Sequence, residues 1–120
     1  MRPVKKILTV VFVLAVFCGH AQSPYVIVLG VAQDGGYPHI GCKKNCCKKA
    51  WANTTNKQYI VSLALVDPRS LKWWLFEATP DIKEQLQYFS NLTNGTYNYL
   101  PDGIFITHAH IGHYTGLMQL

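Results

Sequence analysis

The stretch that decides the fold is Gly103–Leu117, GIFITHAHIGHYTGL, close to the end of the 120-residue chain. It places His108, His110 and His113 directly after an apolar run. Where a strand stays extended, alternate side chains face the same side, so the imidazoles of His108 and His110 can bind one ion. This spacing predicts a metal site at the end of a strand.

Two further residues of the stretch support the metal site. Gly112 permits a sharp bend, so that His113 can approach from the next turn, and Thr107 can fix the loop. Neutral imidazoles suit zinc, and also iron or manganese. A metal with one open position lowers the pKa of its bound water and makes that water a nucleophile. The alternative is a surface turn in which the histidines have no ligand role.

The composition is that of a globular chain with one domain at most. Hydrophobic residues make up 49% and charged residues 14%, and the formal net charge is +5. Arg2, Lys5 and Lys6 supply three of those positive charges at the N-terminus. The rest of the chain has no dense basic stripe of the kind that follows a phosphate backbone, so we expect no nucleic-acid partner.

Residues 1–21 have the pattern of a secretory signal peptide. The positive start precedes an apolar run, Ile7–Phe17, and Gly19 and Ala21 put small residues before the predicted cleavage site. We expect a secreted or periplasmic protein, without membrane attachment after cleavage, whose domain begins at residue 22. The alternative is an uncleaved N-terminal anchor.

The remaining sequence predicts an α+β domain. Strands are expected where apolar runs end at turn signals, and Thr79-Pro80-Asp81 should open a helix whose buried face carries Ile82, Leu86 and Phe89. Residues 39–51 read as a loop, and 114–120 as the start of a helix. The expected strands are a buried one at 25–31, a hairpin at 58–67 and 72–79, and a short one at 104–107.

A cysteine cluster, Cys42, Cys46 and Cys47, lies in the predicted loop, with His39 three residues ahead. Cleavage after residue 21 leaves these three cysteines, an odd number that cannot close into intrachain disulfides. Three thiolates and one imidazole would make a tetrahedral structural zinc site. The alternative is one disulfide from Cys42 to Cys46 or Cys47, with one free thiol.

The stretch ITHAHIGHYTGL resembles the signature loop of metallo-β-lactamase-fold hydrolases, His-x-His-x-Asp-His followed by a helical glycine, here Gly116. Glu77, Pro80 and Asp81 match the acidic strand end and helix start of that family. The segment QDGGYPHIGCKKNCC is similar to the glycine loop and cysteine cluster of one branch, which contains coenzyme pyrroloquinoline quinone (PQQ) synthesis protein B. The resemblance implies the N-terminal half of an αββα sandwich, with a mixed or antiparallel sheet and helices on one face.

For the site, the resemblance implies that His108 and His110 bind a first metal and that His113 binds a second or supports the first. The family's aspartate is replaced by Gly112, which has no ligand atom, so one ion is favoured over two and a lost site is an alternative. Glu77, which is longer than the family's usual aspartate, would hold the histidine ligands in place without binding the metal itself. Thr107 would have the same supporting role. The resemblance also implies a structural zinc near Cys42.

The resemblance implies a metal-dependent hydrolase acting on a small molecule that the sequence does not identify. Further ligands of that family follow the region seen here, so the missing C-terminal half, or a partner, should be needed. We therefore expect this chain alone to be inactive and to leave apolar surface exposed. The alternative is a non-catalytic metal-binding or scaffold relative with a degraded site.

Overall fold

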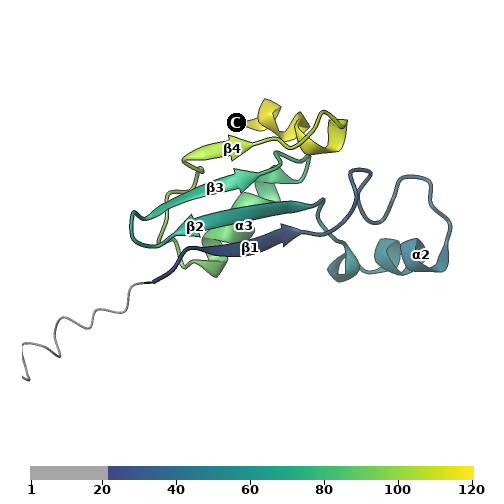
Figure 1. Ribbon diagram of the computed structural model, residues 1–120. Coiled ribbons are helices and arrows are strands. Elements are labelled where there is room, and N and C mark those ends of the chain that lie inside the picture. The colour runs from purple at the N-terminus through teal and green to yellow at the C-terminus, as the bar shows by residue number, and fades with distance from the viewer. Residues whose placement is uncertain (1–21) are drawn as a thin grey trace, which may run out of the picture.

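Four strands form one sheet in the computed structural model, which describes residues 22–120. The predicted signal peptide lies outside the described residues. The sheet order is β1-β2-β3-β4, with β1–β2 and β2–β3 antiparallel and β3–β4 parallel (Figure 1). The strands are β1 (Tyr25–Gly30), β2 (Ser62–Asp67), β3 (Lys72–Phe76) and β4 (Gly103–Phe105). The helices are α2 (Asn45–Ala52), α3 (Ile82–Leu92) and the short 3₁₀ turns η1 (Thr54–Asn56), η2 (Ile111–His113) and η3 (Thr115–Gln119).

The predicted hairpin and the mixed sheet of an α+β sandwich are confirmed. Leu63 pairs with Phe76, and Asp67 pairs with Lys72 beside the turn. At that turn the Asp67 carboxylate accepts a hydrogen bond from the Ser70 hydroxyl at 2.7 Å. This bond holds the pKa of Asp67 below its usual value.

The core lies between the sheet and α3. As predicted, Ile82, Leu86 and Phe89 are buried along one side of the helix, and the Phe89 ring stacks on Trp73 with centroids 3.9 Å apart. The helix begins at Ile82 instead of Pro80. Thr79 precedes its first turn, where the hydroxyl accepts a hydrogen bond from the backbone N–H of Asp81 at 3.1 Å.

The opposite face of the sheet is apolar and open. Figure 1 shows α3 behind the sheet and, within residues 22–120, no helix in front of it. The prediction that β1 is buried is wrong for its outward side chains, since Val26 and Val28 are 55% and 53% exposed. A continuous apolar sequence does not show whether both faces of an edge strand pack against other elements or only one does. The prediction of exposed apolar surface is confirmed, with Phe105 also 52% exposed.

Helix α2 corrects the prediction of a loop over residues 39–51. Its buried residues are Cys47 and Ala50, one turn apart, while the lysines around them stay exposed. The sequence signal was weak because the helix has no side-chain cap hydrogen bond and only this short apolar stripe. In the part of the chain that is described, none of these helices is long and apolar enough to cross a membrane.

Candidate metal centre

Backbone hydrogen bonds hold the histidine loop against the end of β3. The N–H of Glu77 donates to Phe105 O at 2.9 Å, and the N–H of Ala78 donates to His113 O at 2.9 Å. The close approach continues at Gly116, where a Cβ would lie 2.0 Å from Thr79 O. Glycine at this position therefore lets the two segments touch and keeps the histidines beside Glu77.

Glu77 is buried, 5% exposed, and adopts a left-handed backbone with φ 70°. Its Oε1 accepts hydrogen bonds from the Thr107 backbone N–H, at 3.1 Å, and from the Thr107 hydroxyl. Its Oε2 lies 3.3 Å from Nδ1 of His113, yet neither of these two buried atoms makes a hydrogen bond. Buried polar atoms without partners are rare in folded proteins, and two such atoms facing each other suit the binding of a metal ion.

Thr107 also sets the orientation of His108. The Thr107 hydroxyl has one hydrogen, which it donates to Glu77, so at 2.8 Å it accepts from Nδ1–H of His108. In that tautomer Nε2 of His108 carries a lone pair, which accepts a hydrogen bond from Nδ1–H of His110 at 3.1 Å and would be the atom that binds a metal. A histidine ligand whose second nitrogen is held in this way is the usual arrangement at metal sites.

Glu77, His108 and His113 each offer a ligand atom, and these atoms all lie within 4.8 Å of one another. Across residues 22–120 no other such group of three is found. His110 lies next to it, with Nδ1 3.1 Å from Nε2 of His108. Two nitrogens of a tetrahedral zinc site are about 3.3 Å apart, so this spacing also suits a shared ion. The unpaired buried atoms and the imidazole and carboxylate donors thus fit a metal ion.

The structure groups the candidate residues differently from the sequence-based expectation. It brings His108 together with His113 and Glu77, whereas the sequence favoured His108 and His110 and gave Glu77 only a supporting place. The ligand roles themselves stay predictions. A hollow of about 330 Å³ opens beside the group and could admit a small molecule. Its walls are Val61, Ser62, Leu63, Phe76, Glu77, Thr107, His108 and His113.

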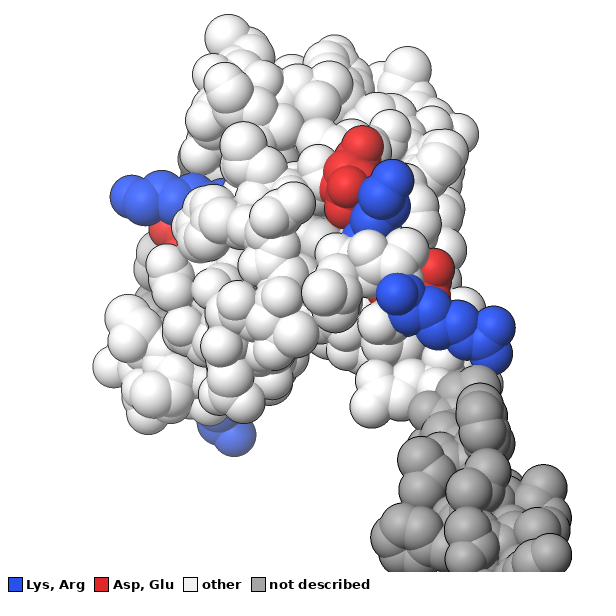
Figure 2. Space-filling view, turned by 90° about the vertical axis from the view of Figure 1, so that its left-hand side faces the viewer, with Lys and Arg blue, Asp and Glu red and all other residues white. Residues whose placement is uncertain are grey.

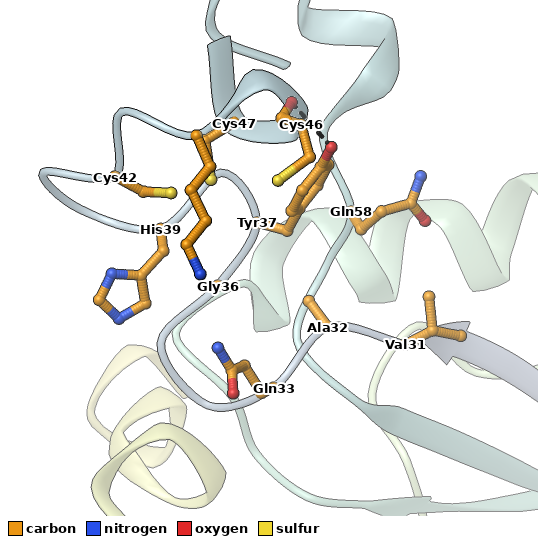
Figure 3. A pocket seen from close by; sticks show the side chains of 11 residues that line it. Val31, Ala32, Gln33, Gly36, Tyr37, His39, Cys42, Cys46, Cys47 and Gln58 are labelled. Atoms are coloured by element: carbon orange, nitrogen blue, oxygen red, sulfur yellow. Dashed lines mark hydrogen bonds between the residues drawn. The ribbon is translucent and has the colours of Figure 1, made fainter. Parts of the chain in front are cut away.

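The cysteine cluster lines a separate, larger hollow of about 610 Å³ (Figure 3). None of these three cysteines forms a disulfide bond. The hydrogen bond between Cys42 and Cys47 lowers the pKa of Cys42, helped by the Lys44 backbone, and raises the pKa of Cys47. Burial and the nearby thiols raise the pKa of Tyr37, whose hydroxyl donates to Cys46 O at 3.0 Å.

His39 lines the same hollow, but Figure 3 shows its ring pointing away from the sulfur atoms. Its Nδ1 lies 2.9 Å from Ile40 O, and its ring covers Gly35, where a Cβ would lie 2.5 Å from the ring's Cδ2. A fourth zinc ligand at His39 would require the ring to turn. The choice between a structural zinc and a disulfide at this cluster stays a prediction.

Charged side chains are sparse on the face shown in Figure 2. Lys and Arg side chains are separate from one another there, and Asp or Glu lies beside some of them. On this face the side chains therefore form no continuous basic patch.

Curated relatives of this chain are coenzyme PQQ synthesis proteins B. The chain is 30% identical over 99 residues to that of Methylorubrum populi, and 34% identical over 101 residues to that of Methylobacillus flagellatus. Each match covers 80% of this chain, and 33% and 32% of the relative. The chain thus spans about a third of the length of the curated relatives it matches. No family model matches it.

Two solved structures are similar. One is a Zn²⁺-bound PqqB from Methylobacterium extorquens, with a TM-score of 0.60 and 28% identity over 81% of this chain and 33% of that one. The other is a diphosphatase from the PhnP family, with the same TM-score and identity over 80% and 34%. Together with the group of Glu77, His108 and His113, the similarity to the zinc-bound structure supports a metal cofactor. The predicted resemblance is thereby confirmed: this chain is a relative of the PQQ synthesis B proteins and has part of the metallo-β-lactamase fold.

Proposed function

We propose that the whole protein is an exported, metal-dependent hydrolase-like enzyme, related to PQQ synthesis protein B, that activates water at the histidine loop. The observation that carries the proposal is the group of Glu77, His108 and His113, in which Glu77 Oε2 and His113 Nδ1 are buried without a hydrogen-bond partner. Zinc is the favoured ion because imidazole and carboxylate donors suit it and because a similar structure holds it. A bound zinc ion would lower the pKa of a water molecule and supply a hydroxide at neutral pH.

The chain's own residues would prepare the site for that chemistry. Thr107 would hold the Glu77 carboxylate and the His108 ring in fixed orientations through one hydroxyl group. Glu77 and His113 are buried, so their donor atoms are kept from competing water, whereas His108 and His110 are exposed and face entering substrate. The adjoining hollow offers mostly apolar walls for the substrate.

Zinc binding can be tested separately from turnover. Metal analysis and titration of the whole protein should give histidine-dependent zinc binding, and His108→Ala with His113→Ala should remove it. Diphosphate esters belong among the substrates assayed, because one similar structure is described as a diphosphatase. Equal zinc content in the wild type and the double variant would refute the proposed centre.

A non-catalytic metal-binding or scaffold protein is the second candidate, and Gly112 favours it because this residue adds no ligand atom to the loop. Histidine-dependent metal binding without turnover of any substrate, in the whole protein, would support that candidate over the enzyme. We also propose, from residues 1–21, that the protein is secreted or periplasmic. Cell fractionation and N-terminal sequencing of the mature protein would test this.

A further inference from the structure

Gly112 lies between His110 and His113, and the space where its side chain would stand is filled by Asp34. A Cβ built on Gly112 would lie 2.4 Å from the Cβ of Asp34, 2.5 Å from its backbone O and 2.7 Å from its Cα. Contacts below 3.0 Å are essentially never seen for real Cβ atoms. The loop after β1 and the histidine loop are therefore packed together at this point, although 78 positions separate the two residues (112 − 34).

The geometry also gives the Asp34 side chain a direction. Its Cβ is nearer than its Cα to the position of the absent Cβ, so its Cα–Cβ bond leads toward residue 112. The turn that presents it is closed by a hydrogen bond from the N–H of Gly36 to Gln33 O at 2.8 Å. A carboxylate on Asp34 thus starts within a few ångströms of the point from which a carboxylate on residue 112 would start.

We propose that Asp34 supplies a second carboxylate to the metal centre, from the loop after β1, in place of the side chain that Gly112 lacks. This inference rests on the proposed metal-binding function. The carboxylate of Asp34 is exposed and has no hydrogen-bond partner in residues 22–120, so no structural contact holds it elsewhere. It lies outside the group of Glu77, His108 and His113, so its side chain would have to turn toward the ion to bind it.

The unpaired buried atoms indicate where the ion would lie, and the charge of the ion favours a second carboxylate beside it. Glu77 Oε2 and His113 Nδ1 mark one side of the centre with unpaired atoms, both in side chains at most 10% exposed. Imidazoles carry no charge when they bind a metal, so Glu77 alone would leave a divalent ion half neutralised. A second carboxylate would complete the neutralisation, and Glu77 and His113 show that water is excluded from one side of the centre.

The test compares zinc affinity in the whole protein and in Asp34→Asn, which keeps the shape of the side chain and loses its charge. Glu84→Gln, an exposed change on α3, is the matched control. Zinc titration against a competing chelator gives the affinity, and the absorption spectrum of the cobalt-substituted protein reports the ligand set. We expect Asp34→Asn to weaken zinc binding by about 10- to 100-fold and to change the cobalt spectrum, while Glu84→Gln does neither.

A second variant, Asp34→Glu, retains the charge and should keep most of the zinc affinity that Asp34→Asn loses. Circular dichroism verifies that each variant is folded. Wild-type affinity in Asp34→Asn, with binding still lost in His108→Ala, would overturn the role of Asp34 and leave the proposed centre intact. Zinc binding with the wild-type affinity and stoichiometry in the His108→Ala, His113→Ala double variant would overturn both.

Discussion

Adding a single methyl group at Gly112 should destabilise the protein, because the loop after β1 occupies that space. In Gly112→Ala the new Cβ would lie 2.4 Å from the Asp34 Cβ and closer than 3.0 Å to two backbone atoms of the same residue. Ordinary contact begins at 3.4 Å, so the atoms must separate by 3.4 − 2.4, or 1.0 Å. Two of the three atoms are backbone, so the loop itself must move.

Overpacking of this kind costs about 1–3 kcal/mol in free energy of unfolding. Urea unfolding measures that difference as a lower midpoint at an unchanged slope. The matched control is Gly103→Ala, whose Cβ would meet only the movable Trp74 ring, at 3.1 Å, and should change stability less. Because the displaced loop also carries Asp34, Gly112→Ala should weaken zinc binding as well.

A Gly112→Ala protein as stable as the wild type would show that the two loops are not packed together at this position. That result would also remove the geometric basis for a contribution of Asp34 to the centre. A stability loss equal to that of Gly103→Ala would do the same, because the new Cβ should meet backbone atoms at Gly112 and only a side chain at Gly103.

Three further predictions concern the core and the titrating groups. Phe89→Ala should lower the free energy of unfolding by about 3–5 kcal/mol, because this ring is fully buried against the sheet; calorimetry or urea unfolding tests it, and a loss below 1 kcal/mol would contradict it. In reduced, metal-free protein Cys42 should react with iodoacetamide faster than Cys47 near neutral pH, since its lowered pKa leaves more thiolate; mass spectrometry measures both rates. Ser70→Ala should raise the pKa of Asp67 toward its ordinary value, measured by NMR titration, and reduce stability at neutral pH but not in acid, where Asp67 is protonated in both states.

The parts of the fold that rest on local periodicity could be predicted from the sequence. The buried side of α3 follows from residues one turn apart, and the hairpin follows from two apolar runs around a turn. The histidine loop was recognisable because its ligand spacing is short and follows a strand. In each case the residues that decide the structure are close together in the chain.

Long-range contacts could not be predicted in this way. Nothing in the sequence near Asp34 indicates that it packs on Gly112, and the left-handed backbone of Glu77 has no local signal because such conformations are usually given to glycine. The open face of β1 was missed for the same reason: which side of an apolar strand is covered depends on where α3 packs.

Glu77 gives the strongest structural reason to read the histidine loop as a functional centre. A non-glycine residue with a left-handed backbone costs about 1–3 kcal/mol, and a carboxylate that is buried with one oxygen unpaired adds a further penalty. A purely structural role would be served as well by a residue without either cost. The Thr107 hydroxyl and backbone N–H hold one oxygen, and the other is left facing His113. An ion between Glu77 and the histidines would offset the burial penalty, which gives the cost of the left-handed, buried carboxylate a physical reason at a metal centre.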